Sequence, residues 1–140
     1  MNYILLVEDD PNDVELILHV FRSNKLANRI EVARDGAEAL ELVYAEDDDG
    51  RMRLPGCILL DLKLPKIDGL EVLRQIKEDR RTKRVPVVIL TSSREVPDLH
   101  RAYELGANSF LCKPMDFNAF VDVVKQIGLY WLLLNEVPPA

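Results

Sequence analysis

Three acidic side chains, one hydroxyl and one ammonium in this sequence lie one or two residues after the end of a short apolar run. They are Glu8, Asp9, Asp61, Thr91 and Lys113. Two carboxylates about 4 Å apart repel by about 4 kcal/mol at an effective dielectric near 20, so three of them together call for a bound cation. Hard oxygen ligands in an open crevice suit Mg²⁺ that retains several of its waters. If the runs are neighbouring strands, the sequence predicts a magnesium site.

A metal ion in such a site would screen the acidic charge, which lets an anionic phosphoryl group approach and be attacked by an aspartate nucleophile. Asp61 is the candidate nucleophile. Lys113 is expected to contact one phosphoryl oxygen as a point charge, and Thr91 to donate its hydroxyl to another. Each residue alone has an ordinary alternative, such as a helix cap, a turn or a solvated charge. Their joint placement after four different apolar runs favours the chemical interpretation.

The apolar runs themselves predict a parallel sheet. Those at 4–7, 57–60 and 87–90 contain no charged residue, as expected for strands covered on both faces. Two weaker runs, 30–33 and 109–112, each include a polar residue, which suits the edges of a sheet. Five strands, each followed by a helix, form βαβ units, and the order 2-1-3-4-5 places the two weaker strands outside. The predicted fold is the α/β, flavodoxin-like doubly wound (βα)5 fold.

Between the strands, apolar residues recur at the spacing of one buried helix face. The predicted faces are Val14, Ile17, Leu18 and Phe21; Ala39, Leu42 and Val43; Leu70, Leu73 and Ile76; Leu99, Ala102 and Tyr103; and Phe117, Phe120, Val121 and Val124. In an open parallel sheet, ligands bind beyond the carboxyl ends of the strands, at the switch point between strands one and three. The acids, the hydroxyl and the ammonium all fall at these strand ends.

The composition indicates one globular domain in the cytoplasm. The chain has 140 residues, 48% of them hydrophobic, which is enough to bury a core without disulfides or structural metals. A net charge of −6 and an isoelectric point near 4.9 argue against sequence-independent nucleic-acid binding. No apolar run approaches the ~20 residues of a membrane span, and the first residues do not resemble a signal peptide. Cys57 and Cys112 form no metal-type pair and are expected to act as small hydrophobes.

Several other polar residues are assigned structural roles. Asp10 precedes Pro11, a favoured first helical residue, and Asp13 follows at the third helical position, so Asp10 is the predicted helix N-cap. His19 and His100 lack a flanking catalytic pattern, and we interpret both as ordinary helix histidines.

The stretches 6–10, 60–65 followed by Asp68 and Gly69, 90–93 and 112–114 resemble the receiver domain of two-component response regulators. The resemblance covers about residues 2–128. It implies that a histidine kinase transfers a phosphoryl group to one aspartate, and that the domain signals through protein contact.

The resemblance also assigns site roles. Asp61 is the implied phosphoacceptor, held with Asp9 as a direct Mg²⁺ ligand, with Glu8 acting through water and the backbone carbonyl of Lys63 completing the protein ligands. Thr91 and Lys113 are the implied phosphoryl contacts. Phe110, three residues before Lys113, is the implied switch aromatic that reorients when Thr91 moves; since it is not tyrosine, a hydroxyl-dependent version of the switch is excluded.

A narrower resemblance points to a partner. Residues 10–13, the long loop before the third strand, residues 86–88 and residues 131–136 resemble single-domain regulators paired with bacterial and cyanobacterial phytochromes. This implies a phytochrome-type photoreceptor kinase as the partner.

The C-terminal end predicts self-association. Residues 1–128 form the expected receiver domain, and 129–140 an apolar helix end and arm. Its first six residues are apolar on every side and too short to span a bilayer, and such a helix cannot lie on a monomer surface in water. They are Leu129, Tyr130, Trp131, Leu132, Leu133 and Leu134. Packing against the receiver domain is the alternative, but it can cover one face and hardly six successive apolar residues. We therefore expect a two-fold dimer, with arms exchanged as the phytochrome-linked relatives imply. No DNA-binding output domain is expected, so an unknown downstream protein would receive the signal.

Three alternative functions share parts of this pattern. A phosphatase with an aspartyl nucleophile normally carries a second aspartate two residues later, where this chain has Lys63. A flavin carrier needs a phosphate-binding loop after the first strand, where Glu8 and Asp9 would repel the phosphate. A dimeric scaffold of the same fold that is never phosphorylated stays open.

Overall fold

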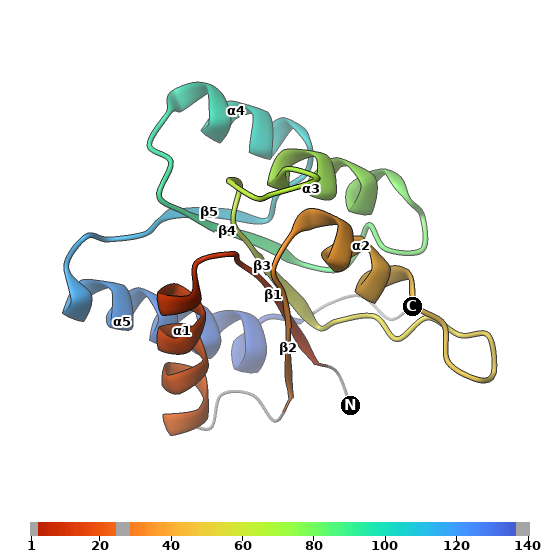
Figure 1. Ribbon diagram of the computed structural model, residues 1–140, viewed down its shortest axis with the longest axis horizontal. Coiled ribbons are helices and arrows are strands. Elements are labelled where there is room, and N and C mark those ends of the chain that lie inside the picture. The colour runs from red at the N-terminus through yellow and green to blue at the C-terminus, as the bar shows by residue number, and fades with distance from the viewer. Residues whose placement is uncertain (1–2, 25–28, 137–140) are drawn as a thin grey trace.

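Five parallel strands form one sheet in the order β2-β1-β3-β4-β5 (Figure 1). The computed structural model describes residues 3–24 and 29–136, without the side chains of 132–134. The strands are β1 Ile4–Val7, β2 Ile30–Ala33, β3 Cys57–Leu60, β4 Val87–Thr91 and β5 Ser109–Cys112. The predicted strands and their order are confirmed, and β4 includes one residue more than expected, Thr91.

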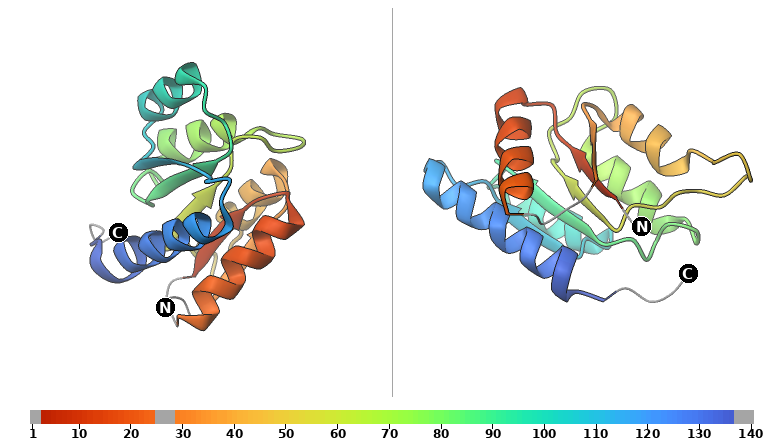
Figure 2. Two further views of the ribbon diagram at one scale, coloured as in Figure 1. Left: turned by 90° about the vertical axis from the view of Figure 1, so that its left-hand side faces the viewer. Right: turned by 90° about the horizontal axis from the view of Figure 1, so that it is seen from below.

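Within the described residues, five helices connect and follow the strands, in two layers. They are α1 Pro11–Ser23, α2 Gly36–Tyr44, α3 Gly69–Glu78, α4 Val96–Glu104 and α5 Phe117–Ile127, and α5 continues into a π-helix, η1 Gly128–Leu134. α1 and α5 pack together on one face of the sheet, and α2, α3 and α4 cover the other (Figure 2). This arrangement is the predicted flavodoxin-like fold.

Two hydrophobic clusters explain why the central strands are apolar at every position. Side chains alternate across a strand, so in β1 Leu5 and Val7 pack under α2 and α3, whereas Ile4 and Leu6 pack under α1 and α5. β1, β3 and β4 are buried throughout, but β2 and β5 are mostly half-buried. The polar residues in β2 and β5 therefore lie where the sheet is least covered.

Two predicted helix faces are partly wrong. On α4 only Ala102 is buried, while Leu99 is 37% and Tyr103 51% exposed, because α4 lies over the edge strand β5 and α3 and meets little of the sheet. On α5, Phe120 and Val124 are buried as predicted, but Phe117 is 66% exposed. Phe117 is the first residue of α5 and precedes the turns that pack against α1.

The apolar C-terminal segment continues α5. Gly128 is buried, Leu129 and Tyr130 are about half exposed, and Trp131 is half-buried. The side chains of Leu132, Leu133 and Leu134, and all of residues 137–140, lie outside the described part of the structure. Within the described residues, no helix has the length and apolar character needed to cross a membrane.

Candidate functional site

The three acids meet because their strands are hydrogen-bonded neighbours. Val7 pairs with Leu60 in the β1–β3 register, and the backbone N–H of Asp61 donates to the carbonyl of Val7 at 3.0 Å. Carboxylate oxygens of Glu8, Asp9 and Asp61 lie within 4.8 Å of one another. Glu8 and Asp61 are buried, and Asp9 is exposed. The predicted acidic group is therefore present at the switch point of the sheet.

Lys113 lies among these acids. Its Nζ is 2.5 Å from Oε1 of Glu8, 3.1 Å from Oδ2 of Asp61 and 2.8 Å from Oδ2 of Asp13. The residue is 8% exposed, and it is placed by its backbone N–H, which donates to the carbonyl of Thr91 at 2.7 Å across the β4–β5 edge. An ammonium has three hydrogens to donate, so the three carboxylates saturate it.

The charges of the site shift the pKa values of Glu8 and Lys113. The pKa of Glu8 is raised to about 7: burial is the main cause, the hydrogen bond from Lys113 opposes it, and the charge of Asp61 adds to it. Burial alone would lower the pKa of Lys113, but hydrogen bonds to Asp13 and Glu8 outweigh it and raise that pKa above its ordinary value. Lys113 is therefore held in its charged form among these acids.

Thr91 begins a chain of hydrogen bonds in the loop after β4. Its side chain is buried, and Oγ1 accepts from the backbone N–H of Ser93 at 3.3 Å. The hydroxyl of Ser93 in turn donates to Oδ2 of Asp98, on the first turn of α4, at 2.6 Å. Phe110 is half-buried on the neighbouring strand β5, opposite Ile89, and packs against the cluster under α2 and α3. The two predicted switch residues thus stand on adjacent strands.

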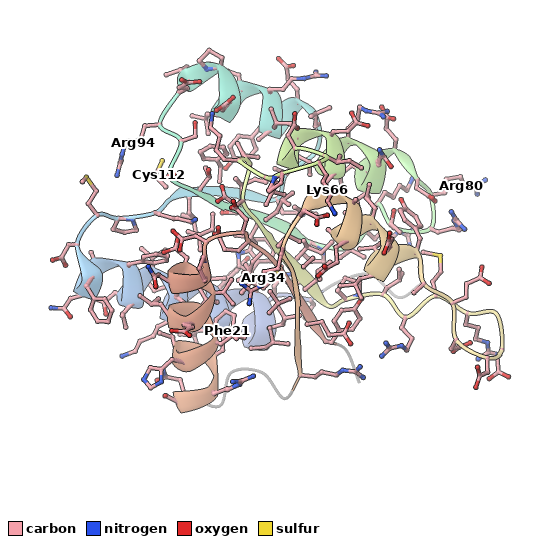
Figure 3. All side chains as sticks on the ribbon, viewed as in Figure 1. Phe21, Arg34, Lys66, Arg80, Arg94 and Cys112 are labelled. Atoms are coloured by element: carbon pink, nitrogen blue, oxygen red, sulfur yellow. The ribbon has the colours of Figure 1, made fainter. Side chains whose placement is uncertain are left out.

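The loop after β4 is also tied to the end of β5. The thiol of Cys112 donates to the carbonyl of Ser93 at 3.4 Å, and Nη2 of Arg94 donates to the carbonyl of Lys113 at 3.4 Å. Figure 3 labels Arg94, in the loop after β4, and Cys112, the last residue of β5, at the same end of the sheet. Both contacts join the segment that carries Thr91 to the segment that carries Lys113.

The loop after β3 is held close to Asp61. The backbone N–H of Lys63 donates to Oδ1 of Asp61 at 3.3 Å, whereas the Lys63 side chain is exposed. A Cβ on Gly69 would lie 2.2 Å from the carbonyl oxygen of Asp61, so only glycine allows this close approach of α3. Lys66, labelled in Figure 3, has φ 67 and its Nζ lies 3.4 Å from Oδ2 of Asp35 before α2.

Sequence reasoning missed one member of the site. Asp10 is the N-cap of α1, as predicted, with its side chain accepting from the backbone N–H groups of Asn12 and Asp13. Asp13 is in the first turn as expected, but its carboxylate also reaches Lys113. The available signal was the position of Asp13 one turn after the acidic strand end, on the helix that starts beside the site.

The acidic group fits a divalent metal. Its donors are carboxylate oxygens from two adjacent strand ends, which is the hard ligand set that Mg²⁺ prefers. Cys57 has no role in this site, because it is buried in the core, where burial raises its pKa to about 12. Cys112, expected to act as a small hydrophobe, is only half-buried and donates its thiol to the carbonyl of Ser93.

Comparison with known proteins agrees with this geometry. Residues 4–125 match the family described as "Response regulator receiver domain". The probable methanogenesis regulatory protein FilR2 of Methanothrix harundinacea is 45% identical over 135 residues, covering 96% of this chain and 86% of that protein.

Two solved structures cover nearly the whole chain. The Mn²⁺-bound form of Rcp1, a response regulator of Synechocystis, superposes with a TM-score of 0.91 at 35% identity, covering 99% of this chain and 100% of that one. The phosphorylated cyanobacterial phytochrome response regulator RcpA superposes with a TM-score of 0.90 at 36% identity, covering 99% of each chain. The chain belongs to the response regulator receiver domain family, a phosphoacceptor signalling module rather than an enzyme.

Proposed function

We propose that this receiver domain accepts a phosphoryl group on Asp61 from a sensor histidine kinase, in a reaction that needs Mg²⁺. The observation that carries the proposal is the buried carboxylate of Asp61. It is grouped with Glu8 and Asp9 and accepts a hydrogen bond from the ammonium of Lys113. A carboxylate oxygen of Asp61 attacks the phosphorus of a phosphohistidine. The O–P bond forms as the P–N bond breaks, and the electron pair of that bond stays on the imidazole nitrogen.

Four groups of this chain are proposed to hold the ion. Asp9 and Asp61 bind it directly, the backbone carbonyl of Lys63 completes the protein ligands, and Glu8 acts through water. The grouped oxygens of Glu8, Asp9 and Asp61 support this assignment, as does the Mn²⁺ bound in Rcp1. When bound, Mg²⁺ neutralises the charge that builds on the phosphoryl oxygens.

Lys113 and Thr91 are proposed to hold the phosphoryl group once it is on Asp61. Lys113 already donates to Oδ2 of Asp61, so a small shift brings its ammonium to a phosphoryl oxygen. Thr91 must turn its hydroxyl from the N–H of Ser93 toward the site. That movement releases the loop after β4, and Phe110 on the adjacent strand repacks in response.

The proposed kinase is a phytochrome-type photoreceptor. The similarity of this chain to RcpA, described as a cyanobacterial phytochrome response regulator, along 99% of both chains supports this partner. The output of the domain is then a protein contact, and a downstream protein reads the state of Asp61.

A two-fold dimer through the C-terminal segment is the second part of the proposal. Residues 1–128 are the receiver domain and 129–140 the dimerisation segment. Leu129 and Tyr130 are about half exposed, and Tyr130 and Trp131 line an apolar pocket with α5 and β5. Two neighbouring apolar side chains exposed beside an apolar pocket favour a second copy of this surface as the partner.

A phosphodonor experiment tests the central proposal. The protein is incubated with acetyl phosphate and Mg²⁺, and its intact mass is measured for wild type, Asp61→Asn and Asp68→Asn. Asp68 is the N-cap of α3 in the loop after Asp61, and asparagine preserves that cap. We expect one added phosphoryl group on wild type and Asp68→Asn, none on Asp61→Asn, and none when EDTA removes the metal.

The same experiment distinguishes the phosphoacceptor role from that of a dimeric scaffold that is never phosphorylated. A wild-type protein that gains no mass with acetyl phosphate or with a phosphorylated phytochrome kinase, yet forms a dimer, contradicts the phosphoacceptor role and supports a scaffold.

A further inference from the structure

Lys113 has a carboxylate partner outside the acidic group. Oδ2 of Asp13 lies 2.8 Å from Nζ of Lys113, and the Asp13 side chain is 22% exposed. The acids whose oxygens gather within 4.8 Å of one another are Glu8, Asp9 and Asp61, and Asp13 is not among them. The contact therefore adds a fourth carboxylate from α1, one that touches the ammonium rather than the grouped acids.

Helix stabilisation alone does not account for this contact. An acid in the first turn of a helix is favourable wherever its side chain points, and Asp10 already caps α1. Glu15, two residues later, is an exposed acid on the same helix. The distinguishing feature of Asp13 is the hydrogen bond to a residue 100 positions away at the end of β5.

The three partners of the ammonium differ in what else they do. In the proposed function Glu8 and Asp61 both serve the metal, and Asp61 also receives the phosphoryl group. Asp13 has neither task. The hydrogen bond from Lys113 to Asp13 can therefore persist while the other two N–H groups of the ammonium turn toward a phosphoryl oxygen.

We propose that Asp13 is a positioning residue for phosphoryl transfer: it anchors the Lys113 ammonium at the edge of the acidic group, so that the remaining donors face the incoming phosphoryl oxygens. The inference rests on the proposed function. Without Asp13 the ammonium has only Glu8 and Asp61 as partners, and it occupies oxygens that the metal and the phosphoryl group need.

The test compares Asp13→Ala, Asp13→Asn and Glu15→Gln with wild type at saturating Mg²⁺. A misplaced catalytic group costs one to two orders of magnitude in rate, so Asp13→Ala should slow phosphorylation by acetyl phosphate about tenfold. Asp13→Asn keeps an acceptor oxygen without the charge and should recover part of the loss. Glu15→Gln removes the same charge from the same helix and should keep the wild-type rate.

Binding of beryllofluoride, a phosphoryl mimic, gives a readout without turnover. With Mg²⁺ saturating, Asp13→Ala should bind beryllofluoride about tenfold more weakly, by the same loss of positioning, and its melting temperature without ligands should match that of Asp13→Asn. A purely structural role would lower that melting temperature and leave beryllofluoride affinity unchanged.

Two results would overturn the inference. One is an Asp13→Ala rate and beryllofluoride affinity equal to those of Glu15→Gln. The other is a faster rate in Asp13→Ala, which would mean that Asp13 withholds Lys113 from the site. Both leave the proposed function intact, because that proposal is tested separately by phosphorylation of wild type and its loss in Asp61→Asn.

Discussion

The hydroxyl of Ser93 donates a 2.6 Å hydrogen bond to Oδ2 of Asp98, which joins the loop after β4 to the first turn of α4. The N-cap residue of α4, Glu95, makes no side-chain cap bond, and only Ala102 on this helix is buried. α4 is therefore held at its start by the Ser93 hydroxyl, which donates to Asp98 and accepts from the backbone N–H of Glu95 at 3.4 Å. Ser93 also contacts Thr91 through its own N–H. A movement of the Thr91 side chain can therefore affect α4 through Ser93.

Asp98→Ala should loosen α4 more than the rest of the fold. Loss of one hydrogen bond to a partly exposed carboxylate should lower the free energy of unfolding by about 1 kcal/mol. Amide hydrogen exchange within α4 should quicken, while exchange in β1 and β3 follows global unfolding. Urea unfolding and native-state exchange measure the two effects. Glu95→Ala is the control, and equal exchange of α4 in both variants would contradict the anchoring role.

Mg²⁺ at millimolar concentration should raise the melting temperature of wild type, because an ion that binds only the folded state stabilises it by mass action. Asp9→Ala should abolish the rise, since it removes an exposed member of the acidic group. Asp10→Asn removes a neighbouring charge but keeps the N-cap oxygen, so it should retain the rise. Melting curves of wild type that are identical with and without Mg²⁺ would rule out the metal site.

The sheet and the acidic group were predictable because they depend on local rules. A strand covered on both faces must be apolar throughout, and the residue after each such run must lie at the carboxyl edge. The runs ending at Val7 and Leu60 thus located Glu8 and Asp61 with no knowledge of tertiary contacts.

The features that the sequence did not predict depend on how helices and strands pack against one another. Leu99 and Tyr103 have the spacing of a buried face, but how much of α4 meets the sheet is set by its place over the β5 edge. The Asp13–Lys113 bond joins residues 100 positions apart, and helical position alone does not indicate where a first-turn side chain points. Such contacts follow from the packing of α1 against the strand ends.

The contribution of Lys77 to the free energy of unfolding should increase with pH. Its Nζ donates to the carbonyls of Lys83 and Val85 and to Oδ1 of Asn108, and burial lowers its pKa to about 8. Since that pKa is lower than in the unfolded chain, the unfolded state binds more protons between about pH 8 and pH 10.5, and stability rises across this window. Below it, both states are protonated and the burial cost is fully present.

Comparison with Lys77→Met isolates this effect. Urea unfolding of both proteins at about pH 8 and about pH 10 should show wild type gaining on the order of 1 kcal/mol relative to the variant, a value reduced because solvent reaches part of the side chain. Lys125→Met, at an exposed position on α5, is the control and should show no such gain. A difference between wild type and Lys77→Met that stays constant with pH would refute the assignment.

Tyr130→Glu should weaken the proposed dimer. Tyr130 is 51% exposed in the C-terminal segment, beside Leu129 and in edge-to-face contact with Trp131. A carboxylate there would have to be desolvated on association, so we expect the dissociation constant of the dimer to rise at least about tenfold. Light scattering over a concentration series measures it. Tyr103→Glu, at a tyrosine of equal exposure on α4, should leave the dimer unchanged. A wild-type protein that is monomeric at every concentration would refute the dimer, and equal weakening by both variants would move the interface away from the C-terminal segment.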